Sequence, residues 1–328
     1  MNRSEFLFWV VDVLFHIPQN YVRVKGISCV KDIVYDDKYP DDCTMDIYFK
    51  ENAPKPMPVI VNIHGGGFVK GDKKHRISIA HMYAARGWFV VNINYRLSPA
   101  YPFPASTDDT LRAINYLKTL REKYDINLDK VVLTGDSAGA FLAASAESVI
   151  TNPDLRERLG VTGCDIKPAG LALFCGPYDL VAAMKTKLPF GILKSIAESF
   201  TGMKFDKTLS NISEYKYLND ISPISYVNSE WPPTVLSMSK KDFFCKGHGE
   251  LMYDKLKAAG VKVEEHHSVK GFDNHCYHFN YWRKASKEAL SMVFGFLDGL
   301  YALEPETALG TDAAAADGSV SAEEESAE

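Results

Sequence analysis

Strand-like apolar runs alternate with helical patterns along most of this chain, and this alternation restricts the fold more than any other feature. Leu111, Ile114 and Leu117 recur at helical spacing, as do Ala289 and Val293 near the end. Strands that alternate with helices predict an α/β fold, with a mostly parallel sheet and helices on both faces. The predicted strands are 59–63, 88–94, 131–134, 170–175, 234–238 and 261–266.

Two regions depart from this alternation. DIVYDD at 32–37 and TMDIYFK at 44–50 predict an antiparallel hairpin at the edge of the sheet. The region 180–231 is helical with no matching strand, so we expect an insertion. Together with an N-terminal helix, this insertion would form a cap over one edge of the sheet.

The N-terminal run FLFWVVDVLFHI has two interpretations, a covering helix or a signal and membrane segment. Phe6, Trp9, Val10 and Val13 have the i, i+3, i+4, i+7 spacing of an amphipathic helix that packs on other elements. An acidic residue interrupts the run, no small-x-small cleavage site follows, and the run is too short to span a bilayer. We therefore favour the covering helix and expect no stable membrane insertion.

Charge and cysteine usage limit the partners and the compartment. The net charge is −5, but the eight acidic residues from Glu304 onward leave a body of about +3, and neither value indicates nucleic-acid binding. The biased, acidic segment 304–328 predicts a disordered tail. Six dispersed cysteines with no CxxC pair indicate reduced thiols, and hence a cytoplasmic protein. A homodimer through exposed edge strands stays open.

GDSAG at 135–139 lies between a β-branched run and a small-residue helix. In this context of strand, turn and helix, the G-x-S-x-G motif predicts a nucleophile elbow. Gly135 and Gly139 leave room for a sharp turn that holds Ser137 above the start of the helix. The helix N-terminus also favours negative charge near the serine.

A nucleophilic serine needs a base and an orienting carboxylate, which follow it in the chain in such enzymes. Asp242 follows one predicted strand, and His275 and His278 follow the next. Asp179 is a rival acid because it also follows a strand. Sequence order therefore agrees with a serine, acid and histidine set.

HGGGF at 64–68 places three glycines directly after a strand. Glycine weakens regular structure by roughly 0.5–1 kcal/mol relative to alanine, so the run needs a reason. It is either a tight turn or a place where bare backbone amides approach a reacting oxygen. It lacks the Lys-Ser/Thr ending of a phosphate-binding loop, which argues against nucleotides.

Taken together, these motifs resemble the hormone-sensitive-lipase-like branch of the α/β-hydrolases. HGGGF, the segment NYRLSPAYPFPASTDD at 94–109, and GDSAG occur here in the order of that family. The resemblance implies that Ser137, Asp242 and His275 form the catalytic triad. It also implies that the amides of Gly66, Gly67 and Ala138 form the oxyanion hole.

The same resemblance implies an α/β-hydrolase fold with a helical cap. We divide the chain into an N-terminal cap helix region (1–30), a catalytic domain (31–303) with a cap insertion at about 180–231, and the tail (304–328).

This sequence departs from the family at two of the three triad motifs. DFFCKGHGE replaces an aspartate-proline-leucine segment, and HCYHF replaces histidine-glycine-phenylalanine. Aligning His275 with the family histidine keeps an aromatic residue two places later, so we favour it over His278. Asp242 is favoured over Asp179 because the family places its acid one strand later.

The residues predict a serine carboxylesterase without a cofactor, and the resemblance alone suggests short-chain substrates, acetyl esters among them. An amide or peptide hydrolase on the same fold and a non-catalytic ligand-binding homologue are the alternatives. The H-x-x-H at 275–278 lacks a third ligand at helical spacing, so we predict no metal. His64, Tyr95, Arg96 and Asp136 are expected to brace the loops around the site.

Overall fold

One eight-stranded sheet forms the centre of the computed structural model, which describes residues 1–186 and 191–301. Its strands are β1 (Ser28–Val34), β2 (Thr44–Phe49), β3 (Met57–Ile63), β4 (Phe89–Ile93), β5 (Ile126–Asp136), β6 (Gly170–Phe174), β7 (Thr234–Ser239) and β8 (Val263–Ser268). They are arranged in the order β1-β2-β4-β3-β5-β6-β7-β8. β2 pairs antiparallel with both β1 and β4, and the remaining neighbours are parallel. The predicted α/β class, parallel majority and antiparallel edge hairpin are therefore confirmed, although the first strand of the hairpin lies at 28–34 and not at 32–37.

The last strand begins two residues later than predicted. The amide of Val261 donates to the carbonyl of Leu256 at 3.0 Å, so this valine closes the preceding helix before β8 starts at Val263. β8 is an edge strand that carries glutamates and histidines, and its side chains are mostly half-buried. The sequence of β8 is less apolar than that of the central strands, because an edge strand is less buried.

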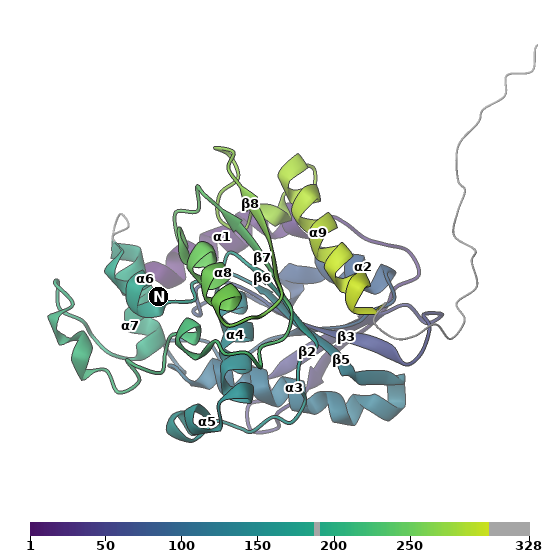
Figure 1. The fold of residues 1–328 in the computed structure, drawn as a ribbon, viewed down its shortest axis with the longest axis horizontal. Helices are drawn as coiled ribbons and strands as arrows, with labels where there is room; N and C mark the ends of the chain where they lie inside the picture. Colours follow the sequence, from purple (N-terminus) through teal and green to yellow (C-terminus); the bar gives the residue numbers. More distant parts are fainter. Residues whose placement is uncertain (187–190, 302–328) are drawn as a thin grey trace, which may run out of the picture.

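Helices cover both faces of the sheet (Figure 1). α2 and α9 pack on one face, and α3, α4 and α8 pack on the other. The α-helices are α1 (Arg3–Asn20), α2 (Ile77–Ala85), α3 (Ala105–Tyr124), α4 (Ala138–Thr151), α5 (Pro153–Leu159), α6 (Leu180–Lys185), α7 (Ile192–Thr201), α8 (His248–Ala258) and α9 (Lys284–Tyr301). Short 3₁₀ helices are η1 (Lys73–Arg76), η3 (Ser210–Glu214), η4 (Pro223–Tyr226) and η5 (Tyr277–Phe279).

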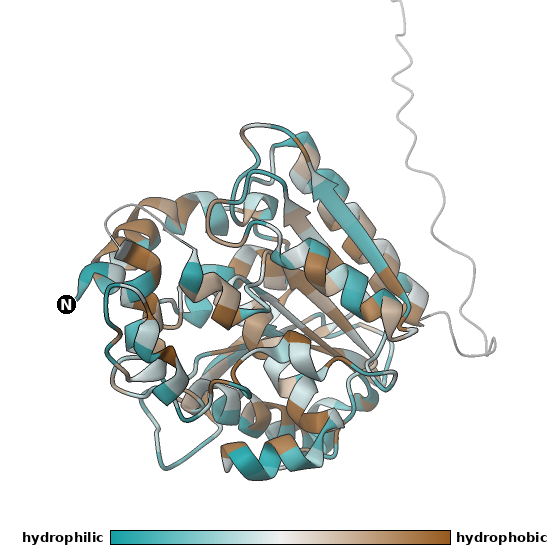
Figure 2. Ribbon diagram, turned by 60° about the vertical axis from the view of Figure 1, so that its left-hand side comes forward, coloured by the Kyte–Doolittle hydropathy of each residue, from teal (hydrophilic) through white to brown (hydrophobic). Residues whose placement is uncertain are grey.

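The core is two apolar layers, one on each face of the sheet. Along β3, Val59, Val61 and Ile63 face the layer under α3 and α4, whereas Ile60 faces the layer under α2 and α9. Both layers are needed because side chains alternate between the faces of a strand. Figure 2 shows the result as mostly apolar central strands inside helices of mixed hydropathy.

The N-terminal helix is present, but its predicted packing face is wrong. Phe6, Trp9 and Val13 are 53%, 49% and 59% exposed, and Phe8 is buried instead. α1 contacts α7 and η1 through a different, partly polar side. The sequence indicates helical periodicity, but it cannot say which side of a helix with apolar residues on several sides contacts the protein. No helix within the described residues is long and apolar enough to cross a bilayer.

The insertion at 180–231 contains α6, α7, η3 and η4 and no strand within its described residues. The side-chain amide of Asn2 donates to Ser199 at 3.0 Å, and the amide of Ser4 donates to Ser195 at 3.3 Å. These bonds join the insertion to α1. The domain division at residue 30 stays a prediction, and the predicted tail at 304–328 lies outside the described residues.

Candidate active site

Ser137 occupies the sharp turn between β5 and α4. Its backbone has φ +54° and ψ −118°, a conformation that costs a non-glycine residue energy and is found mainly at functional sites. Its amide donates to the carbonyl of Phe174 at 2.8 Å. A side chain on Gly135 would collide with the backbone of Gly139, and one on Gly139 with the carbonyl of Ile63. The flanking glycines therefore permit the turn, as expected.

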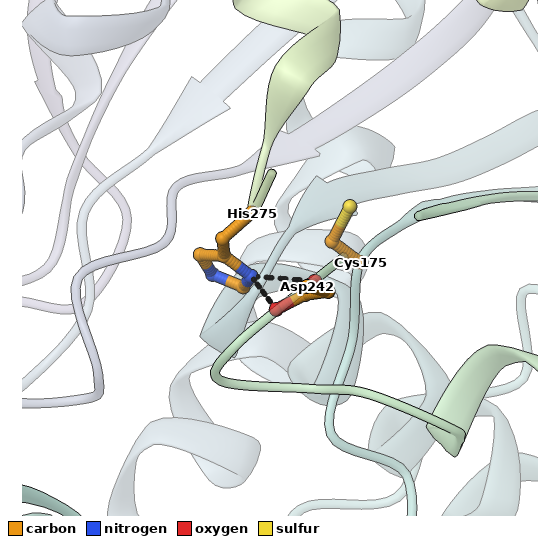
Figure 3. Close-up of side chains that lie close together, drawn as sticks. All are labelled: Cys175, Asp242 and His275. Atoms are coloured by element: carbon orange, nitrogen blue, oxygen red, sulfur yellow. Dashed lines mark hydrogen bonds and ion pairs between the residues drawn. The ribbon is translucent and has the colours of Figure 1, made fainter. Parts of the chain in front are cut away.

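The structure brings Asp242 and His275 to this serine. His275 Nε2 lies 2.8 Å from Ser137 Oγ, and His275 Nδ1 lies 2.8 Å from Asp242 Oδ2 and 3.0 Å from Oδ1. Figure 3 shows the imidazole facing the carboxylate. Because a carboxylate accepts, Nδ1 carries the proton and Nε2 accepts from the serine hydroxyl. The hydroxyl is therefore placed to lose its proton to the ring.

Burial and charge act against each other at this pair. Burial disfavours the imidazolium, but the charge and hydrogen bonds of Asp242 outweigh it and hold the pKa of His275 above its ordinary value. Burial also disfavours the carboxylate of Asp242, but His275 and the amides of Cys245 and Phe244 hold its pKa below the ordinary value. Asp242 is thus charged at neutral pH and stabilises an imidazolium beside it.

The rival residues lie elsewhere. His278 is buried with its ring stacked on Phe174 at 4.1 Å, and its Nδ1 has no hydrogen-bond partner among the described residues. Burial lowers the pKa of His278 to about 3, so its ring is neutral. Asp179 caps α6, where Oδ1 accepts from the amide of Ala182 at 2.9 Å. Neither residue forms a hydrogen bond with Ser137 within the described chain.

Asn274 connects the loops that carry the acid and the histidine, and the sequence did not single it out. Its Oδ1 accepts from the amide of Phe243 at 3.2 Å and from the amide of His275 at 2.7 Å. Asp273 next to it is buried and pairs with Arg283 at 2.9 Å. An asparagine beside a histidine gives no sequence signal for this role, because both bonds depend on where the two loops meet.

The glycine loop has left-handed backbone at Gly66 (φ +123°) and Gly67 (φ +59°). Within the described chain, neither amide donates a hydrogen bond to another protein group. A side chain on Gly66 would collide with the carbonyl of Lys70, and one on Gly67 with the ring of Phe8. The protein's own atoms therefore fill the space that side chains at these two positions would need.

The four bracing residues have defined contacts. His64 Nδ1–H donates to the carbonyl of Gly65 at 2.7 Å, and burial lowers the pKa of His64 to about 4, so the ring is neutral. Its ring stacks on Tyr95 at 4.4 Å, and the hydroxyl of Tyr95 donates to the carbonyl of His64 at 2.9 Å. Arg96 pairs with the buried Asp109 at 2.6 Å. These contacts confirm that His64, Tyr95 and Arg96 hold the loops beneath the site.

Asp136 is buried beside the serine and pairs with Arg76, which the sequence did not single out. Arg76 Nε and Nη2 donate to the two carboxylate oxygens at 2.5 and 2.6 Å, and the amide of Gly65 donates at 3.3 Å. Burial opposes the charge, but Arg76 outweighs it and holds the pKa of Asp136 below its ordinary value. The ion pair therefore fixes the glycine loop against the serine turn, as expected for Asp136.

Two cavities open on Ser137. The first, of about 60 Å³, is almost entirely apolar and lies beside Gly67 and Ala138 under α6 and α7. The second, of about 300 Å³, has a mixed lining that includes His275 and Asp136, and α1 forms one wall. The serine therefore lies between a narrow apolar cavity and a wider one of mixed lining.

Cys175 lies beside the histidine and the acid (Figure 3). Its Sγ and one ligand atom each of Asp242 and His275 lie within 4.8 Å of one another, the one potential metal-ligating group of three within the described chain. Both nitrogens of His275 are used in hydrogen bonds to Ser137 and Asp242. The arrangement matches a hydrogen-bonded set better than a set of metal ligands.

Comparisons with known proteins identify the family of this chain. The BD-FAE family model matches residues 45–255. Esterase LipQ of Mycobacterium tuberculosis (strain ATCC 25618 / H37Rv) is 31% identical over 204 residues, covering 60% of this chain and 45% of LipQ. Probable carboxylic ester hydrolase LipM of the same strain is 28% identical over 187 residues, covering 56% of this chain and 41% of LipM. The matches thus span less than half of either relative.

A solved structure shows the same fold. The crystal structure of esterase B from Lactobacillus rhamnosis (HN001) superposes with a TM-score of 0.75 at 18% identity, covering 90% of this chain and 93% of that one. At this sequence identity the structural similarity supports only the fold. The family match extends over more than half of this chain and includes the glycine loop, the serine turn and the acid. The chain therefore belongs to the BD-FAE family and has an α/β-hydrolase fold.

Proposed function

We propose that this protein is a serine carboxylesterase that cleaves esters of short acyl chains. The observation that carries the proposal is the continuous hydrogen-bonded line from Ser137 through His275 to Asp242, at 2.8 Å in each step. The names of the relatives LipQ and LipM support an ester hydrolase. The six free cysteines support a reducing compartment such as the cytoplasm.

In the proposed reaction His275 removes the proton of Ser137 as its Oγ attacks the ester carbonyl. Asp242 keeps the imidazole in the tautomer that accepts at Nε2 and stabilises the imidazolium that forms. The amides of Gly66, Gly67 and Ala138 receive the developing oxyanion, and losing one such donor typically costs on the order of 3 kcal/mol. His275 then protonates the leaving alcohol, and water activated by the same ring releases the acyl group.

The two cavities support an arrangement for the two halves of the substrate. The leaving oxygen must take its proton from His275, so the alcohol belongs in the wider cavity that His275 lines. The acyl chain then enters the narrow apolar cavity beside Gly67 and Ala138. At about 60 Å³ this cavity suits an acyl group of a few carbons, acetyl included.

A series of p-nitrophenyl esters from acetate to laurate tests the proposal on wild-type protein and Ser137→Ala. We expect kcat/KM to be highest for short chains and Ser137→Ala to lose at least about 10³-fold. Activity that survives the alanine change would show that the nucleophile lies elsewhere. A matching acyl-amino anilide series is expected to be much slower, and the reverse order would identify an amide hydrolase.

A fluorophosphonate probe tests the site without turnover. Covalent labelling of wild-type protein but not of Ser137→Ala is expected, because the phosphonate needs an activated serine. Absence of labelling in wild-type protein would favour a non-catalytic binding protein.

A further inference from the structure

The outer face of α1 exposes large apolar side chains to solvent. Phe6, Trp9 and Val13 lie on one side of the helix, and Ile17, one turn further on, is 76% exposed. Of the 18 residues in α1, only three are buried, and two of these are polar. Soluble proteins rarely leave such a contiguous apolar face uncovered, and large exposed patches mark interaction sites.

A second group of exposed aromatic side chains lies at the wider cavity. Phe15, Phe243 and Phe272 line that cavity, yet they are 46%, 50% and 86% exposed. They come from α1, from the loop after β7 and from the loop after β8. We define the apolar rim as Phe6, Trp9, Val13, Phe15, Phe243 and Phe272.

The exposed charged side chains in the segments that carry the apolar rim are basic. The rim lies in the segments 1–25, 240–246 and 269–284, where several lysines are exposed and no acidic residue is. Lys240, Lys241 and Lys270 adjoin Phe243 and Phe272, and none of the three has an ion-pair partner within the described chain.

The acidic residues of these segments form contacts within the protein. Glu5 caps the start of α1 and Asp12 lies 3.4 Å from His75, while Asp242 and Asp273 are buried against His275 and Arg283. The surface thus combines aromatic rings with unneutralised positive charge, which complements a layer of anionic headgroups over hydrocarbon.

We propose that the apolar rim and its lysines dock this protein on an anionic lipid surface, with the opening of the Ser137 cavity toward the bilayer. A second copy of the chain is a poorer occupant, because a two-fold contact through this face would bring the same lysines together. Since no described helix can span a bilayer, the contact is peripheral. The docking does not depend on the reaction proposed above.

Vesicle flotation of the full chain tests this docking. Vesicles of phosphatidylcholine alone are compared with vesicles of equal parts phosphatidylcholine and phosphatidylserine, at low and high salt. We expect at least about tenfold stronger partitioning to the phosphatidylserine vesicles, and weaker partitioning at high salt because salt screens the lysines. Equal partitioning to both vesicles, or to neither, would overturn the proposal.

Two variants and their matched controls locate the surface. Phe6→Ser/Trp9→Ser and Lys240→Gln/Lys241→Gln/Lys270→Gln are each expected to weaken partitioning about fivefold or more. Val30→Ser and Lys31→Gln/Lys38→Gln/Lys55→Gln alter exposed residues away from the rim and should bind like wild type. Equal losses in the controls would contradict the assignment.

Folding and self-association are monitored in the same proteins. Thermal unfolding identifies a variant that fails to fold, and the lysine variant keeps the test decisive because its side chains are exposed. Sizing chromatography without lipid is expected to give the same species for wild type and Phe6→Ser/Trp9→Ser. A wild-type dimer that this variant dissociates would assign the rim to self-association and overturn the lipid proposal.

Discussion

The ring of Phe8 on α1 fills the space that a side chain on Gly67 would need. An N-terminal helix thereby contacts the loop that we propose as half of the oxyanion hole. This contact couples the position of α1 to the direction of the Gly67 amide.

Gly67→Ala is expected to lower both stability and kcat, because the new methyl group must displace Phe8 and the backbone has φ +59°. The left-handed backbone alone costs an alanine about 1–2 kcal/mol. Phe8→Ala should relieve the collision, so the double variant should lose less activity than the two single losses combined. Double-mutant cycles of kcat and urea unfolding measure this coupling, and simple additivity would contradict it.

The pH dependence of catalysis should report His275. The reaction needs the neutral ring, and Asp242 holds the pKa of His275 above 6.5, so kcat/KM should rise with pH through an apparent pKa above that value. Asp242→Asn removes the charge that raises this pKa. Its residual activity, lower by roughly 10³–10⁴-fold, should therefore titrate at lower pH than wild type.

Rate profiles of wild type and Asp242→Asn from pH 5 to 9 check this shift. Asn keeps the size of the side chain, so circular dichroism should match wild type. An unchanged apparent pKa in Asp242→Asn would mean that another group controls the profile.

His278 is expected to be dispensable for the chemistry. Its ring packs on Phe174 and has no hydrogen bond to Ser137. His278→Gln should keep kcat within a fewfold of wild type, although loss of a buried ring can lower stability by about 1–3 kcal/mol. His275→Gln should abolish turnover while remaining folded. If the two variants exchange these behaviours, the base is His278.

Glu147 on α4 should make stability fall with rising pH. It is buried, its Oε2 has no partner within the described chain, and burial raises its pKa to about 8. In the unfolded chain Glu147 ionises near the ordinary pKa of glutamate. The free-energy cost of keeping its carboxyl neutral in the folded protein therefore grows from that pH to about pH 8, and it is constant at higher pH.

Glu147→Gln removes this titration and should raise the melting temperature more at pH 8 than at pH 5. Glu122→Gln on the exposed side of α3 is the control and should change the melting temperature little at either pH. A difference between Glu147→Gln and wild type that is the same at both pH values would contradict the assignment.

The sequence determined the class of fold and the local geometry of the serine turn. Periodicity indicated the strands and helices because alternating layers must bury one face of each element, and Gly135 and Gly139 indicated a turn that no other residue allows. The order of Ser137, Asp242 and His275 followed from the same local signals and from the family resemblance.

Only the tertiary structure decided which groups meet. It placed His275 rather than His278 within 2.8 Å of Ser137, brought Arg76 to Asp136, and put Phe8 against Gly67. It also turned Phe6 and Trp9 outward, against the prediction that they pack on the protein. The physical reason is that periodicity describes a single element, whereas contacts depend on how elements distant in the chain fill the same space.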